Sequence, residues 1–216
     1  SGNRCERGED IDDLGTDDKK STLPNMFKYK YDRTFKYKAL AKEDAPRGVI
    51  GIPRVLNQYE NYPYWFTILT KLGFSVKVSA RSSHALFERG MDTIPSESVC
   101  YPAKLAHGHI ENLISRGITT IFYPDVPYET NENMNSGNHY NCPIVCSYPE
   151  VIRNNVEDLK ENDIRFLNPF MPLDNPECVI DKLVSTFSYL SVTKEEATIA
   201  VNAGIEEYKR FKQDIR

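Results

Sequence analysis

Short apolar runs alternate with amphipathic stretches along most of the chain. The apolar runs are bounded by Gly, Pro or polar residues, which is typical of buried strands. They predict strands at residues 49–52, 74–78, 93–94, 118–123, 143–145 and 164–167. The stretches between them carry apolar residues at helical spacing and predict helices at 63–72, 82–89, 103–116, 149–160 and 175–189. Strands that alternate with helices pair in parallel, so we expect an α/β fold with an open, mostly parallel sheet flanked by helices.

The two ends of the chain lie outside this alternation. We expect a flexible lead-in, an aromatic and basic arm with a linker, the α/β domain and a long C-terminal amphipathic helix, at residues 1–20, 21–47, 48–192 and 193–216. Thr193 and Glu196 have the spacing of a capping box at the start of that last helix. In the lead-in we expect Cys5 to be an exposed thiol without a ligand role. The chain starts Ser1-Gly2-Asn3-Arg4, without an initiator Met or a signal peptide, so we expect a fragment of a longer protein.

Residues 28–38, K-Y-K-Y-D-R-T-F-K-Y-K, interleave basic and aromatic side chains. Such a pattern can bind single-stranded nucleic acid, and it also suits an arm that packs its rings on the main domain. The net charge of the chain is −4, so no overall positive field attracts nucleic acid. We therefore expect the arm to pack on protein, and no nucleic-acid partner.

Composition narrows the class of protein. The 216 residues are 40% hydrophobic and 27% charged, which is ordinary for a chain with a hydrophobic core. No apolar run approaches the ~18 residues of a membrane span, so we expect no membrane partner. The 5 cysteines are irregularly spaced, which argues against a disulfide framework. We expect a cytoplasmic protein, where clustered cysteines more often bind metals or do redox chemistry.

Two stretches with cysteines carry the strongest chemical signal. Cys100 lies just before a predicted helix start, where the partial positive charge of the helix favours a thiolate. Cys142 and Cys146 lie four residues apart with a strand-like segment between them, which would put both on one side. Thiolates suit iron–sulfur clusters and zinc. Because the chain has no C-x-x-C pair, the spacing leaves open that Cys146 is a small buried residue and Cys142 a loop thiol.

The longest predicted loops, 54–62 and 124–141, follow the first and third of the main strands. In open parallel sheets of the flavodoxin or Rossmann type, ligands bind beyond the carboxyl ends of the strands. A loop as long as 124–141 is usually functional or disordered, and this one leads through His139 into Cys142. We therefore expect function at this edge of the sheet.

Other candidate residues give weaker signals. Glu97 could relay a proton near Cys100, or serve only as a carboxylate at a helix start. Arg54 follows the first strand and could hold an anion. His107 and His109 are two residues apart, so on a helix we expect one to be exposed and the other packed. The chain has neither of the common glycine-rich nucleotide-binding motifs.

Several longer motifs resemble one family. They read G-I-P-R at 51–54, Y-E-N-Y-P-Y-W-F at 59–66, P-S-E-S-V-C-Y-P-A-K-L-A-H-G-H-I at 95–110, N-H-Y-N-C-P-I-V at 138–145 and S-Y-P-E-V-I at 147–152. From residue 2 onward the chain resembles the uncharacterised domain of the large activase-related proteins linked to 2-hydroxyacyl-CoA dehydratases. In that family the domain follows ATPase domains of the acetate-kinase, hsp70 and actin type. It is also similar to the dehydratase subunits, whose cysteines hold a 4Fe–4S cluster.

The resemblance implies that Cys100 and Cys142 are cluster ligands. The sequence departs from the expected pattern at two positions. Cys146 stands where Thr is more usual, and Asp125 stands where Cys is often found. The resemblance therefore implies a third ligand from Cys146 or from Asp125, or no cluster at all.

Two functions follow from these observations. The first is an iron–sulfur redox module that takes part in ATP-driven electron delivery to a dehydratase-type partner, or in reductive or dehydrating chemistry on an acyl-CoA in anaerobic metabolism. For this function Glu97 and Arg54 are the candidate catalytic residues, and the ATPase domains of the same longer chain are the expected neighbours. If it is an enzyme, it is a component of an acyl-CoA dehydratase or reductase activation system. The second is a non-catalytic scaffold with a structural zinc held by Cys100, Cys142, Cys146 and His139. Either function is compatible with a homodimer.

Overall fold

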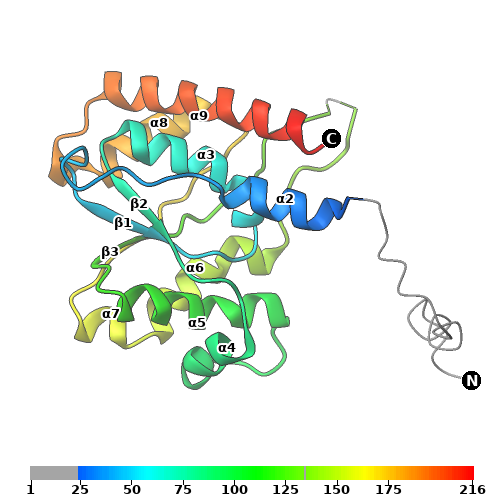
Figure 1. Ribbon diagram of the computed structural model, residues 1–216, viewed down its shortest axis with the longest axis vertical. Coiled ribbons are helices and arrows are strands. Elements are labelled where there is room, and N and C mark those ends of the chain that lie inside the picture. Colours follow the sequence, from blue (N-terminus) through cyan, green and yellow to red (C-terminus); the bar gives the residue numbers. More distant parts are fainter. Residues whose placement is uncertain (1–23, 134) are drawn as a thin grey trace, which may run out of the picture.

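A parallel β-sheet lies at the centre of the computed structural model, which describes residues 24–133 and 135–216 (Figure 1). The sheet has 4 strands in the order β2-β1-β3-β4, formed by Ser75–Val78, Val49–Ile52, Thr120–Phe122 and Arg165–Leu167. Ile50 of β1 pairs with Val76 of β2, Gly51 pairs with Ile121 of β3, and Ile121 pairs with Phe166 of β4. All these pairs are parallel, which confirms the predicted α/β fold with an open parallel sheet.

Helices cover both faces of the sheet (Figure 1). One face carries α3 (Gln58–Lys71), α8 (Pro176–Thr186) and α9 (Lys194–Asp214). The other carries α4 (His84–Gly90), α5 (Tyr101–Ser115), α6 (Pro143–Asn155) and α7 (Asp158–Glu161). Each face has a separate apolar core, centred on Trp65 and Phe122 on the first and on Ile121 and Ile110 on the second. The chain thus forms three layers, with the sheet as the middle layer. β1 and β3 are the two central strands of that sheet.

The aromatic arm packs on α3. It forms α2 (Met26–Phe35), which begins at the N-cap Asn25. The ring of Phe35 lies 5.1 Å from that of Tyr62, and the ring of Tyr37 lies 4.9 Å from that of Phe66. Tyr29 stays 47% exposed. The packing of Tyr31, Phe35 and Tyr37 agrees with the predicted role of the arm.

Two predicted strands are wrong. Residues 143–145 form the first turn of α6, because Pro143 suits the start of a helix and Cys142 supplies the N-cap. The short strand expected at 93–94 is replaced by a 3-10 turn, Met91–Thr93. Apolar runs of two or three residues carry too little periodicity to separate a strand from a helical turn.

Several helix ends also differ from the prediction. α3 begins five residues before the expected start, with Pro63 inside the helix. The helix expected at 149–160 is two helices, α6 and α7, and the one expected at 175–189 is α8 followed by a 3-10 turn, Ser188–Leu190. The capping box at Thr193 and Glu196 is confirmed at the start of α9. The lead-in and Cys5 lie outside the described residues. Within the described part of the chain, no helix is both long and apolar enough to cross a membrane.

Candidate functional site

The carboxyl edge of the sheet gathers most of the candidate residues. Arg54 follows β1, Ser79 follows β2, and Asp125 follows β3. The β3–β4 pairing continues past the strands, because Asp125 N donates to the carbonyl of Pro169 at 3.0 Å and Met171 N donates to the carbonyl of Asp125 at 2.8 Å. This fixes Asp125 at the edge from which α5 and α6 also start.

Cys100 and Cys142 hold equivalent positions on two neighbouring helices. Cys100 is the N-cap of α5 and Cys142 is the N-cap of α6, and each helix has a Pro in its first two positions. The Cys142 sulfur accepts a hydrogen bond from Val145 N at 3.4 Å. Both thiols are exposed. The helix start at Cys100 is therefore confirmed, and Cys142 also lies at the positive end of a helix, which the sequence did not predict.

The two helices pack against each other through a buried hydrogen-bonded pair. Nε2 of His107 on α5 lies 3.1 Å from the hydroxyl of Tyr148 on α6, and Nδ1 lies 2.7 Å from the Thr93 hydroxyl. Burial raises the pKa of Tyr148 to about 12, with a smaller contribution from Cys100. The pair therefore joins the two helices below the thiols.

Both histidines of α5 are buried, so the expectation that one would be exposed is wrong. His109 lies between two serines, with Nδ1 2.7 Å from Ser79 Oγ and Nε2 3.0 Å from Ser82 Oγ. α5 is covered by α6 on the His107 side and by the end of β2 on the His109 side. Burial lowers the pKa of each imidazole to about 4, so both are neutral at pH 7.

Cys146 lies one turn inside α6 and faces the interior. Its Sγ lies 3.7 Å from the carbonyl oxygen of Val126 and 3.6 Å from that of Asn141. Burial raises the pKa of Cys146, and the nearby Cys142, Asp125 and Glu129 add to this effect. Cys146 therefore lies one helical turn from Cys142 and also close to Asp125.

Asp125 is a buried carboxyl group with unused hydrogen-bonding capacity. Its exposure is 9%, and its Oδ2 accepts from Asn168 Nδ2 at 3.4 Å. Oδ1 has no hydrogen-bond partner among residues 24–133 and 135–216. Burial raises the pKa of Asp125 to about 7, and the charge of Glu150 acts in the same direction.

A polar cluster that sequence reasoning missed connects this edge to α3. Nδ2 of Asn61 lies 3.0 and 2.9 Å from the two carboxylate oxygens of Glu129. Nδ2 of Asn141 donates to Glu129 at 2.6 Å and to the Val126 carbonyl at 2.9 Å. Burial raises the pKa of Glu129. Glu129 is one of three acids in the long loop, and nothing in the local sequence pattern distinguishes it from an acid on the surface.

Three other predicted site residues make their contacts away from the thiols. Arg54 donates to the Tyr31 hydroxyl at 2.5 Å and lies 4.4 Å from the centre of the Phe35 ring, so it contacts the arm. His139 Nε2 lies 3.3 Å from Asp174. Glu97 is exposed, and its backbone carbonyl accepts from Lys104 Nζ at 2.7 Å.

The structure therefore brings Cys100, Cys142, Cys146 and Asp125 to one edge of the sheet. In the described parts of the chain, no group of 3 or more His, Cys, Asp or Glu side chains is placed to hold a metal ion.

The comparisons with known proteins agree with the motifs. Residues 49–216 match the family model described as the CoA enzyme activase uncharacterised domain. No curated protein and no solved structure gave a significant match to the chain.

Proposed function

The chain belongs to the CoA enzyme activase uncharacterised domain family, and from this membership we propose that it is an iron–sulfur-binding redox module of acyl-CoA dehydratase activation. In this proposal it takes part in ATP-driven electron delivery to a dehydratase-type partner, and ATPase domains of a longer chain are its neighbours. Cys100 and Cys142 would hold the cluster, and Cys146 or Asp125 would complete the ligand set.

The observation that carries this proposal is the position of two exposed thiols at the N-termini of two adjacent helices. An iron–sulfur cluster held by thiolates is an anionic group, and its potential depends on the hydrogen bonds and dipoles around it. The free N–H groups of a helix start provide both. α5 and α6 present Cys100 and Cys142 in this way at the edge where open parallel sheets bind ligands.

The donor chemistry of these residues fits such a group. Thiolates are the preferred ligands of iron–sulfur clusters, and Cys146 adds a third thiol one turn along α6 from Cys142. The described residues do not already form a metal-binding group of three, so binding requires the segments before α5 and α6 to rearrange around the cluster. A bound cluster would supply one-electron transfer.

The test is anaerobic reconstitution of the full chain with iron and sulfide, followed by iron and sulfide analysis and visible spectroscopy. The wild type should bind a cluster with broad absorption in the blue region. Cys100→Ser and Cys142→Ser should each abolish the bound iron. Cys178→Ser is the matched control, because Cys178 also lies in the first turn of a helix, α8, but on the opposite face of the sheet.

Three results would contradict the proposal. One is a wild type that binds no iron, and another is equal iron in Cys142→Ser and wild type. A third is loss of iron in Cys178→Ser to the same degree as in Cys100→Ser. A colourless protein that contains one zinc per chain would favour the scaffold function instead.

A further inference from the structure

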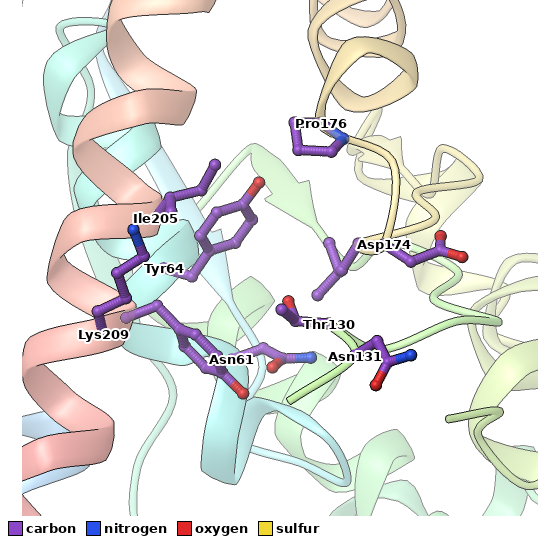
Figure 2. A pocket seen from close by; sticks show the side chains of 10 residues that line it. Asn61, Tyr64, Thr130, Asn131, Asp174, Pro176, Ile205 and Lys209 are labelled. Carbon is purple, nitrogen blue, oxygen red and sulfur yellow. The ribbon is translucent and has the colours of Figure 1, made fainter. Parts of the chain in front are cut away.

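A cavity of about 260 Å³ lies on the opposite side of the carboxyl edge from the thiols. It is bounded by α3, α9, the start of α8 and the loop that follows β3 (Figure 2). Most of its wall is apolar or aromatic, and the main contributors are Tyr64, Leu173, Pro176, Ile205 and Tyr208. Concave pockets with mostly apolar walls and a few polar groups are the usual form of small-molecule sites.

Asn61 provides one buried polar group at this cavity. Its exposure is 0%, and Figure 2 shows its amide extending toward Thr130 and Asn131. The amide orientation is fixed, because Nδ2 is the atom that lies between the two carboxylate oxygens of Glu129. The oxygen Oδ1 therefore remains, and it has no hydrogen-bond partner among the residues that the structure describes.

An unpartnered buried acceptor is rare in folded proteins and destabilising unless a donor reaches it. Two polar side chains close to Asn61 donate to other groups. Asn141 uses its amide N–H groups on Glu129 and Val126, and the side chain of Tyr208 donates to Glu132 at 3.2 Å. An N–H group of a molecule in the cavity can therefore supply the missing donor.

We propose that this cavity binds a small, flat aromatic compound that carries an N–H or amino group. The size fits, because an apolar cavity of about 150 Å³ holds benzene, and a larger one suits a bicyclic ring. The walls fit as well, since the rings of Tyr64 and Tyr208 meet edge-to-face at 6.4 Å and offer both faces and edges to another ring. The N–H of the ligand donates to Asn61 Oδ1.

The proposal is independent of the iron–sulfur proposal, because it involves none of the thiols. The two sites nevertheless share a polar connection. Asn61 bonds Glu129, Glu129 bonds Asn141, and Asn141 directly precedes Cys142.

The test titrates the full chain with indole and, separately, with indene, and protein NMR monitors the binding. The two molecules have nearly the same shape, but only indole has an N–H. Indole should bind about tenfold more tightly than indene, since one neutral hydrogen bond to a buried acceptor has an effect of that order. In Asn61→Ala this preference should disappear.

A pair of variants on α9 locates the site. Ile205→Trp places a large ring in the cavity and should weaken indole binding by at least about tenfold. Ile199→Trp is the control, because Ile199 lies on the same helix but is 58% exposed and does not line the cavity. It should bind indole as the wild type does.

Three outcomes would overturn the proposal. The first is no binding of indole or indene to the wild type. The second is equal affinity for indole and indene, which would remove the role of Asn61. The third is unchanged indole binding in Ile205→Trp, which would place the ligand elsewhere. Cluster content is measured separately, so failure of either proposal does not affect the other.

Discussion

The thiols at the carboxyl edge differ from each other in exposure and in hydrogen bonding. Cys142 is exposed and its sulfur accepts a hydrogen bond at a helix start, whereas Cys146 is partly buried and lies near two carbonyl oxygens. Carbonyl oxygens accept hydrogen bonds, so they favour the protonated thiol of Cys146 over its thiolate. The two residues are four positions apart in sequence, yet they present different chemistry to solvent.

This difference predicts an order of alkylation. At pH 8 Cys142 should react with iodoacetamide on the order of tenfold faster than Cys146, because burial raises the pKa of Cys146 and limits access to its sulfur. Peptide mass spectrometry after timed quenching measures both rates in one sample. Equal rates, or faster reaction at Cys146, would show that the local structure around α6 is different from the one described here.

His109 predicts a specific effect of pH on stability. Burial lowers its folded pKa from 6.5 to about 4. Between pH 6.5 and pH 4 the unfolded chain therefore binds a proton on this ring that the folded chain does not bind. The contribution of the neutral ring to stability is fully present above pH 6.5 and is lost as the pH falls toward 4. At pH 5 this loss amounts to about 2 kcal/mol.

The measurement is a comparison of the wild type with His109→Gln by urea unfolding at pH 7 and pH 5. The raised pKa values of Asp125 and Glu111 act in the opposite direction, so the difference between the two proteins is the quantity to follow. The destabilisation caused by His109→Gln should shrink by about 2 kcal/mol on going to pH 5. His84→Gln is the control for the substitution itself, because the side chain of His84 is 79% exposed.

At the scale of elements, the sequence predicted the strands that are long enough to show a pattern. β1, β2, β3 and β4 all fall within predicted strands. The errors occur where contacts between distant parts of the chain determine the local structure or the burial of a side chain. Residues 143–145 resemble a strand in sequence but form the first turn of α6. His109 is buried because Ser79 and Ser82 contact it from a distant part of the chain. The partners of Glu129 likewise come from α3 and from the end of its own loop, so no local pattern could reveal them.

α4 and α5 cross at two glycines, which leads to a prediction on Gly108. A Cβ atom built there would lie 1.9 Å from the backbone oxygen of Leu86, a position that only backbone movement can relieve. Gly108→Ala should therefore lower the free energy of unfolding by about 3 kcal/mol.

Chemical denaturation measures this change. Gly137→Ala is the control, because a Cβ atom at Gly137 meets nothing within 4 Å. Its effect should stay within about 0.5 kcal/mol of the wild type. A neutral Gly108→Ala variant would mean that α4 does not cross α5 at this point.

At the scale of the whole molecule, the two ends of the described chain are joined. Arg33 of α2 is 6% exposed and bonds two acids of α9, Glu207 at 3.0 Å and Asp214 at 2.6 Å. α9 in turn packs along α3, the helix that also carries the arm (Figure 1). The arm, α3 and α9 therefore pack together as one unit, although the arm and α9 come from opposite ends of the sequence.

Removal of Arg33 should loosen this unit. Arg33→Ala leaves Glu207, which is only 14% exposed, without its buried cation, and loss of one partner of a buried ion pair costs about 3 kcal/mol. Asp214 is more exposed and should contribute little to that cost. The arm should then be cleaved by trypsin before the rest of the chain, and at a faster rate than in the wild type.

Lys28→Ala is the matched control, because the ion pair of Lys28 with Asp32 is exposed and lies on the same helix. This variant should change the cleavage rate of the arm little. Equal cleavage in Arg33→Ala and Lys28→Ala would mean that the aromatic contacts of Phe35 and Tyr37 hold the arm on α3 without the ion pairs to α9.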